Sequence, residues 1–129
     1  MNCLLDTCAI IHLANSDASL GSAARRKIAD TSCTMYVSAI TATEISIKAG
    51  KGKLMLPMPA GQWLSEVIRL HHLTFLPLEM PESIASGQLP WIHSDSFDRL
   101  LIATAQTRNL AILTSDRIIP TYPGVRVIW

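Results

Sequence analysis

The fold is decided by residues 93–116, which read HSDSFDRLLIATAQTRNLAILTSD. The first half has the spacing of an amphipathic helix, in which Asp98 shares a face with Leu101 and its apolar neighbours. The second half contains a short apolar run, residues 110–114, that is typical of a buried strand, and Asp116 comes just after it. The stretch therefore predicts a helix followed by a strand, each of which brings one acid toward the sheet.

Strand and helix patterns alternate along the rest of the chain. Short apolar runs predict further strands at residues 3–5, 34–38, 74–76 and 125–128. Helical spacing predicts further helices near residues 8–15, 22–30, 40–50, 63–71 and 81–88. This alternation predicts an α/β fold, a three-layer α/β/α sandwich with a mainly parallel central sheet, formed by a single domain over residues 1–129.

Two more acids occupy equivalent places in the pattern. Asp6 comes directly after the first strand, and Glu44 lies between Ile40 and Ile47 on an apolar helix face. A charge there needs a reason, because burial of an unpaired carboxylate is costly. In open parallel sheets the carboxyl ends of the strands face the ligand crevice. One shared acidic pocket is therefore predicted, formed by Asp6, Glu44, Asp98 and Asp116.

Three of these acids also have a purely structural explanation. Glu44 ends a capping-box pattern, Asp95 can cap a helix whose first turn favours Asp98, and Asp116 fits a turn. Asp6 has no comparable explanation. Because one pattern recurs four times in a chain with 10 acidic residues, a functional pocket is the favoured interpretation.

A cluster of carboxylates has a definite chemistry. Carboxylates held close together repel one another, so some bind protons or a cation neutralises them. Oxygen ligands without Cys or His favour Mg²⁺, with Mn²⁺ as an alternative. Such ions promote in-line attack of water on a phosphodiester. The acids therefore predict a metal-dependent phosphodiesterase.

The motifs around these acids resemble those of PIN-domain ribonucleases, and specifically of the VapC-type toxins of type II toxin–antitoxin modules. They lie at residues 4–7, 37–44, 52–57, 93–103 and 113–116. The most specific is the one at residues 93–103, in which Ser96 stands where relatives often have proline. The resemblance implies a metal-dependent endoribonuclease that hydrolyses RNA, is silenced by a cognate antitoxin and forms a homodimer.

The same resemblance assigns the site residues. The family's metal-binding and catalytic acids fall on Asp6, Glu44, Asp98 and Asp116. Asp95 is a further candidate metal ligand, although capping of the helix is favoured for it.

Substrate contacts must be local, since a net charge of +1 is not that of a general nucleic-acid binder. Arg99 and Arg117 each follow an acid and His93 precedes the Asp95 segment, so these three are candidates for phosphate contacts. Arg99 can equally be an ordinary exposed helix residue. Two threonines flank the acids and can hydrogen-bond a carboxylate or a water, namely Thr7 and Thr114.

Three lysines look suited to bind RNA, namely Lys48, Lys51 and Lys53. The helix that carries Glu44 is expected to start at the acidic edge and to lead them away from it, so they are predicted to form a solvated face. The three cysteines contain no Cys-x-x-Cys pair and are expected to be buried and reduced.

No apolar run approaches the length of a membrane span, and Met1 leads into the first strand without a signal peptide, so a cytoplasmic protein is expected. The mean hydropathy of +0.29 favours apolar surface covered by a partner. A catalytically silent PIN-like module that binds RNA or protein is the alternative function. A phosphoaspartate enzyme ranks last, because Asp6-Thr7-Cys8 lacks the second aspartate of such sites.

Overall fold

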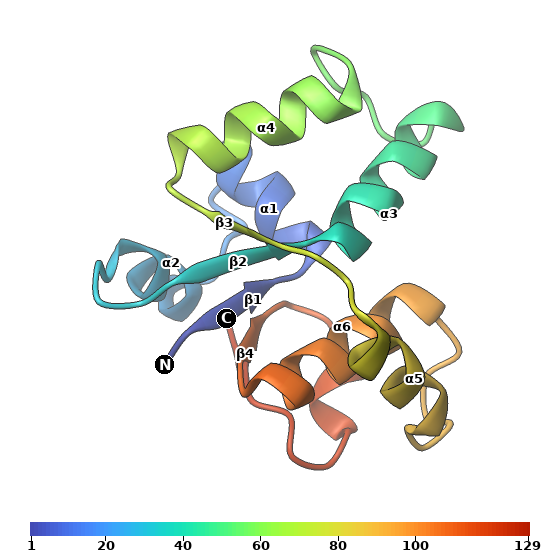
Figure 1. Ribbon diagram of the computed structural model, residues 1–129. Coiled ribbons are helices and arrows are strands. Elements are labelled where there is room, and N and C mark those ends of the chain that lie inside the picture. The colour runs from blue at the N-terminus through green and yellow to red at the C-terminus, as the bar shows by residue number, and fades with distance from the viewer.

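The protein, described here by a computed structural model over residues 1–129, is built on one parallel sheet (Figure 1). Its strands are β1 (Cys3–Leu5), β2 (Met35–Ser38), β3 (Thr74–Leu76), β4 (Ala111–Leu113) and β5 (Val127–Ile128). They lie in the order β3-β2-β1-β4-β5, and every neighbouring pair is parallel. The predicted parallel sheet is confirmed.

Six α-helices connect and cover the strands. They are α1 (Thr7–Ala14), α2 (Ser22–Ala29), α3 (Ala39–Gly50), α4 (Ala60–Leu70), α5 (Met80–Gln88) and α6 (Ser96–Arg108). A 3₁₀ helix that the sequence did not predict, η1 (Ile119–Thr121), follows β4. The helices are too short or too polar to cross a membrane. The three cysteines form no disulfide, and Cys3 is buried, but the prediction that all three are buried is wrong, because Cys8 and Cys33 are partly exposed.

The two faces of the sheet are buried in separate cores. Cys3 and Leu5 of β1 point into a core formed with α1 to α4, and Leu4 points into a second core formed with α5 and α6. In β4, Ala111 and Leu113 belong to the first core and Ile112 belongs to the second. Figure 1 shows α1, α3 and α4 on one side of the sheet and α5 and α6 on the other. The predicted three-layer α/β/α sandwich is therefore confirmed.

The strand order positions the candidate site. From β1 the chain proceeds outward through β2 and β3 on one side, and it later returns to pair β4 with the other side of β1. Strand order thus reverses between β1 and β4, and ligands of open α/β sheets bind at the carboxyl ends of the strands at such a point. The backbone N–H of Asp6 donates to the carbonyl of Leu113 at 3.0 Å. The segment after β1 is therefore held beside the end of β4.

Candidate active site

Asp6 lies between β1 and α1, where it serves as the N-cap of α1. Its Oδ1 accepts a hydrogen bond from the backbone N–H of Thr7 at 2.7 Å, and its Oδ2 accepts one from the hydroxyl of Thr114 at 2.6 Å. The residue is 7% exposed. Burial raises the pKa of Asp6 and the charge of Glu44 adds to the rise, while these hydrogen bonds lower it. Asp6 is therefore a buried carboxylate held in one orientation.

Glu44 approaches Asp6 from α3. The helix begins at Ala39 with Ser38 as its cap, so the capping-box explanation for Glu44 is wrong. Its Oε1 accepts a hydrogen bond from the hydroxyl of Thr7 at 2.7 Å. Its Oε2 pairs with the ammonium of Lys48 at 2.7 Å, and the Glu44 side chain is only 11% exposed.

Lys48 corrects the prediction that the lysines of this region lead away from the acids. It lies one turn after Glu44 on the same face of α3, so its ammonium returns to the pocket. The hydrogen bond to Glu44 raises the pKa of Lys48, and the charges of Asp95 and Asp6 add to the effect. Lys51 and Lys53 are exposed, as expected. The pocket therefore contains a cation of its own.

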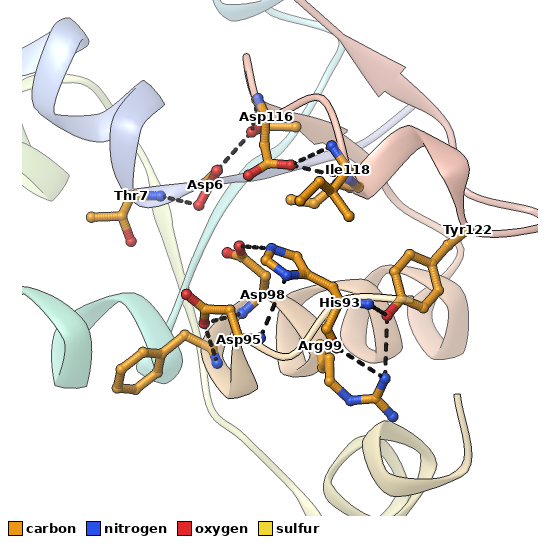
Figure 2. Close-up of polar contacts among 12 residues, drawn as sticks. Asp6, Thr7, His93, Asp95, Asp98, Arg99, Asp116, Ile118 and Tyr122 are labelled. Carbon is orange, nitrogen blue, oxygen red and sulfur yellow. Dashed lines mark hydrogen bonds and ion pairs between the residues drawn. The ribbon is translucent and has the colours of Figure 1, made fainter. Parts of the chain in front are cut away.

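Asp98 and Asp116 meet His93 at the other side of the pocket (Figure 2). Nε2 of His93 lies 2.8 Å from Oδ2 of Asp98. One ligand atom from each of these three residues lies within 4.8 Å of the others, which is close enough for a single metal ion. Oδ1 of Asp116 also accepts hydrogen bonds from the backbone N–H groups of Ile118 and Ile119, so the turn role predicted for Asp116 accompanies its place in the pocket.

The pKa shifts show that the pair Asp6 and Glu44 interacts electrostatically with the pair Asp98 and Asp116. Burial, and then the charges of Asp6, Asp95 and Asp116, raise the pKa of Asp98 to about 7, against the lowering effect of its contact with His93. Asp6 in turn is influenced by Glu44. All four predicted acids are thus brought into one electrostatic cluster. Mutually repelling carboxylates and mainly oxygen donors fit Mg²⁺ or Mn²⁺.

Asp95 is a helix cap in this arrangement. Its Oδ1 accepts hydrogen bonds from the backbone N–H groups of Phe97 at 2.9 Å and Asp98 at 3.2 Å. The favoured capping role is therefore confirmed, and the charge of Asp95 contributes to the raised pKa of Asp98.

The two threonines hold carboxylates. Thr7 donates to Glu44, and Thr114 donates to Asp6 while its hydroxyl oxygen accepts the backbone N–H of Asp116 at 3.0 Å. Both threonines are buried. Of the two roles predicted for them, these contacts match the hydrogen bond to a carboxylate.

Arg99 is placed differently from both roles predicted for it. It is neither an exposed helix residue nor directed at the acids, since only 3% of it is exposed. Its guanidinium donates to the hydroxyl of Tyr122 and to the backbone carbonyls of Ser86, Leu89, Pro90 and His93. Figure 2 shows it on the far side of His93 from the acids. Arg99 therefore anchors the segment before α6, whereas Arg117 is exposed.

A surface pocket of about 520 Å³ lies elsewhere, around α2. Arg25 and Arg26 line it, and none of the acids does. The acidic cluster is therefore a candidate active site because of its chemistry and its place at the carboxyl edge of the sheet.

Comparison with known proteins identifies the family. The PIN domain family matches residues 3–125, so the chain belongs to the PIN domain family. No curated protein sequence matches it significantly.

Solved structures share the fold. VapBC2 from Rickettsia felis bound to a promoter DNA fragment has a TM-score of 0.70 at 17% identity, covering 98% of this chain and 97% of that one. DNA-bound VapBC from Salmonella typhimurium has a TM-score of 0.67 at 24% identity, covering 98% and 96%. A toxin–antitoxin complex from Klebsiella pneumoniae has a TM-score of 0.66 at 21% identity, covering 96% and 95%. At these identities the likeness establishes the fold.

The first prediction concerns Asp98 in the metal-free protein. Because the pKa of Asp98 rises from 3.8 to about 7 on folding, the folded state holds its proton more tightly, and stability is lost as pH rises between these values. Asp98→Asn should remove this loss and leave the protein at least as stable as the parent at pH 8. Thermal unfolding in EDTA across pH 4 to 8 measures the effect.

Asp30→Asn is the matched control, because Asp30 is exposed and its pKa is lowered. Asp30→Asn should leave the pH dependence of thermal stability between pH 5 and 8 unchanged. A large loss of stability in Asp98→Asn at pH 8 would instead assign Asp98 a structural role in the first turn of α6.

The second prediction concerns Arg99. Arg99→Ala should lower the free energy of unfolding by about 2–4 kcal/mol, because buried carbonyl groups lose their donor. Chemical denaturation measures it, with the exposed Arg26→Ala as a control expected to change stability by less than about 0.5 kcal/mol. Equal stability of the two variants would contradict the anchoring role.

Proposed function

We propose that the protein is a Mg²⁺-dependent endoribonuclease that hydrolyses RNA phosphodiester bonds and acts as the toxin of a VapC-type toxin–antitoxin pair. The observation that carries the proposal is the convergence of Asp6, Glu44, Asp98 and Asp116 at the carboxyl edge of the sheet of a PIN-family chain. A protein without catalytic duty has no evident need for buried carboxylates that repel one another.

The four acids would hold the metal ion. Bound among them, Mg²⁺ or Mn²⁺ would orient a water for in-line attack and stabilise the charge that develops on the phosphate. Asp98 and Asp116 already lie close enough to share one ion, together with His93. Asp6 and Glu44 lie outside that compact group and face it with oxygens engaged by Thr7, Thr114 and Lys48. Asp95, engaged as a cap, adds negative charge.

The remaining polar groups position the acids and the substrate. Thr7 and Thr114 orient the carboxylates of Glu44 and Asp6, and His93 orients that of Asp98. With Arg99 buried, phosphate contacts fall to Arg117, which is exposed, and to Lys48, whose side chain is 47% exposed.

A partner protein would restrain the enzyme in the cytoplasm. The similar structure from Klebsiella pneumoniae is a toxin–antitoxin complex, and we extend that association to this chain. A basic side chain of the antitoxin can take the place of the metal among the acids. Exposed apolar side chains such as Met80 and Ile84 on α5 offer surface for the antitoxin or for a homodimer.

The third prediction is that RNA cleavage requires both a divalent ion and Asp6. Asp6→Asn keeps the acceptor that caps α1 but removes a charge at the centre of the cluster, so activity and Mn²⁺ affinity should both fall steeply. Cleavage of single-stranded RNA with Mg²⁺ or EDTA, and calorimetric titration with Mn²⁺, measure these effects. Asp30→Asn should retain both properties. Equal cleavage in EDTA would refute the metal mechanism, and RNA binding without any cleavage would favour the silent binding module.

The fourth prediction concerns growth. Expression of the protein alone should arrest growth because cellular RNA is cut, whereas Asp6→Asn should be harmless while still binding the partner. Co-expression with the product of a small neighbouring reading frame should restore growth, and co-purification should recover the complex. An innocuous wild-type protein without a binding partner would end the toxin interpretation even if nuclease activity were found.

A further inference from the structure

Trp91 is a large aromatic side chain that the molecule leaves in solvent. It is 76% exposed and lies in the segment between α5 and α6. A tryptophan at such exposure contributes little to the core, and Trp91 is the most exposed aromatic side chain of the protein.

The ring of Trp91 has a fixed support on one face. The Cζ atom of Arg99 lies 3.6 Å from the ring centroid, within the range of a cation–π contact. Arg99 is itself immobilised by hydrogen bonds to the carbonyls of Pro90 and His93, which flank Trp91 in the chain. The buried guanidinium therefore holds both the ring and its backbone, and the other face of the ring remains available.

The ring of Trp91 is connected to the acidic cluster through His93, and it packs on Arg99 on the far side of His93 from the acids. Trp91 is two residues before His93, so their Cα atoms are at most roughly 7 Å apart. The ring of His93 contacts Asp98 at 2.8 Å, and its backbone N–H donates to the hydroxyl of Tyr122 at 2.8 Å. Figure 2 shows His93 between Asp98 on one side and Arg99 with Tyr122 on the other. One rigid segment thus connects the aromatic ring to the acids.

Because the protein carries little net positive charge, binding of RNA would require contacts that do not depend on charge. RNA is a polyanion, the net charge of the chain is +1, and the candidate site concentrates carboxylates. Phosphate contacts alone therefore supply little affinity. Stacking of a base on an aromatic ring does not depend on charge and is favourable with any base.

We infer that the exposed face of Trp91 is a nucleobase subsite, on which an unpaired base of the bound RNA stacks. This inference rests on the proposed ribonuclease function and adds the recognition of an unpaired nucleotide to it. Because a base must leave its helix to stack on a protein ring, the subsite selects single-stranded or looped RNA. Ile92, although half exposed, has no π face and does not substitute for the ring.

Binding of a fluorescein-labelled single-stranded RNA to the Asp6→Asn protein tests the subsite without any need for cleavage. When Trp91→Leu is introduced into the Asp6→Asn protein, Kd should rise by roughly fivefold to 100-fold. Trp91→Phe in place of Trp91→Leu should retain much of the affinity, because a ring remains. The dependence of Kd on salt should stay the same, whereas Arg117→Ala should make it shallower. Phe75→Leu, which removes a 47% exposed aromatic ring from β3, is the matched control and should leave Kd unchanged.

A set of RNAs, each with one abasic nucleotide, identifies the stacked base. An abasic nucleotide at one position should raise the Kd of the protein that retains Trp91. The same abasic nucleotide should not raise the Kd of the Trp91→Leu protein any further. Additive losses at every position would overturn the inference, as would an unchanged Kd for Trp91→Leu. If that variant kept its Kd but lost self-association in sedimentation, Trp91 would belong to a protein interface instead.

The failures of the two proposals are distinguishable. Cleavage by the wild-type protein with an unchanged Kd for Trp91→Leu removes the subsite and leaves the ribonuclease. Absence of both binding and cleavage removes both. Unfolding curves for Trp91→Leu show whether the ring merely covers Arg99, since a cover would change stability without changing the Kd of the folded protein.

Discussion

Mutual repulsion among the carboxylates at the carboxyl edge of the sheet is the constraint on which the rest of the site depends. Two of the acids are held by donors from distant parts of the chain. Thr114, which follows β4, donates a hydrogen bond to Asp6, and Thr7 of α1 donates one to Glu44. Because these donors are buried, the two acids keep their positions despite the repulsion. A flexible arrangement would relieve the repulsion by moving the charges apart.

The repulsion is only partly compensated within the protein. Lys48 neutralises one edge through Glu44, and Asp98 responds by a pKa raised to about 7. The shift of Asp98 is larger than its neighbours alone produce, since burial is its first cause. The pocket is therefore organised so that it gains from an added cation, whether that cation is a metal ion or a basic side chain from a partner. Under the proposed function, the electrostatics that favour a catalytic metal ion would also favour an inhibitory basic side chain.

The sequence predicted the acids better than it predicted the basic residues around them. Asp6 and Asp116 follow apolar strands, and the parallel sheet alone brings such positions together. Arg99 was assigned wrongly because its burial depends on carbonyl groups of a loop that has no repeating pattern. The contact of His93 with Asp98 likewise crosses a loop. Lys48 is different, because its position four residues after Glu44 predicts a pair on one helix face. The pair was missed because α3 was assumed to lead its lysines away from the acids.

Arg99 links the stability of the fold to the function proposed for it. A basic residue next to Asp98 in the sequence looks suited to bind phosphate. In the structure, however, the guanidinium of Arg99 points inward and donates hydrogen bonds to backbone carbonyls. The result is a rigid segment that presents Trp91 on one side and His93 on the other. With a net charge of only +1, the protein would gain little from counterion release on binding RNA. Under the proposed function, the choice of substrate would therefore depend on a few ordered contacts near the acids, and the buried Arg99 keeps the segment that would make them in order.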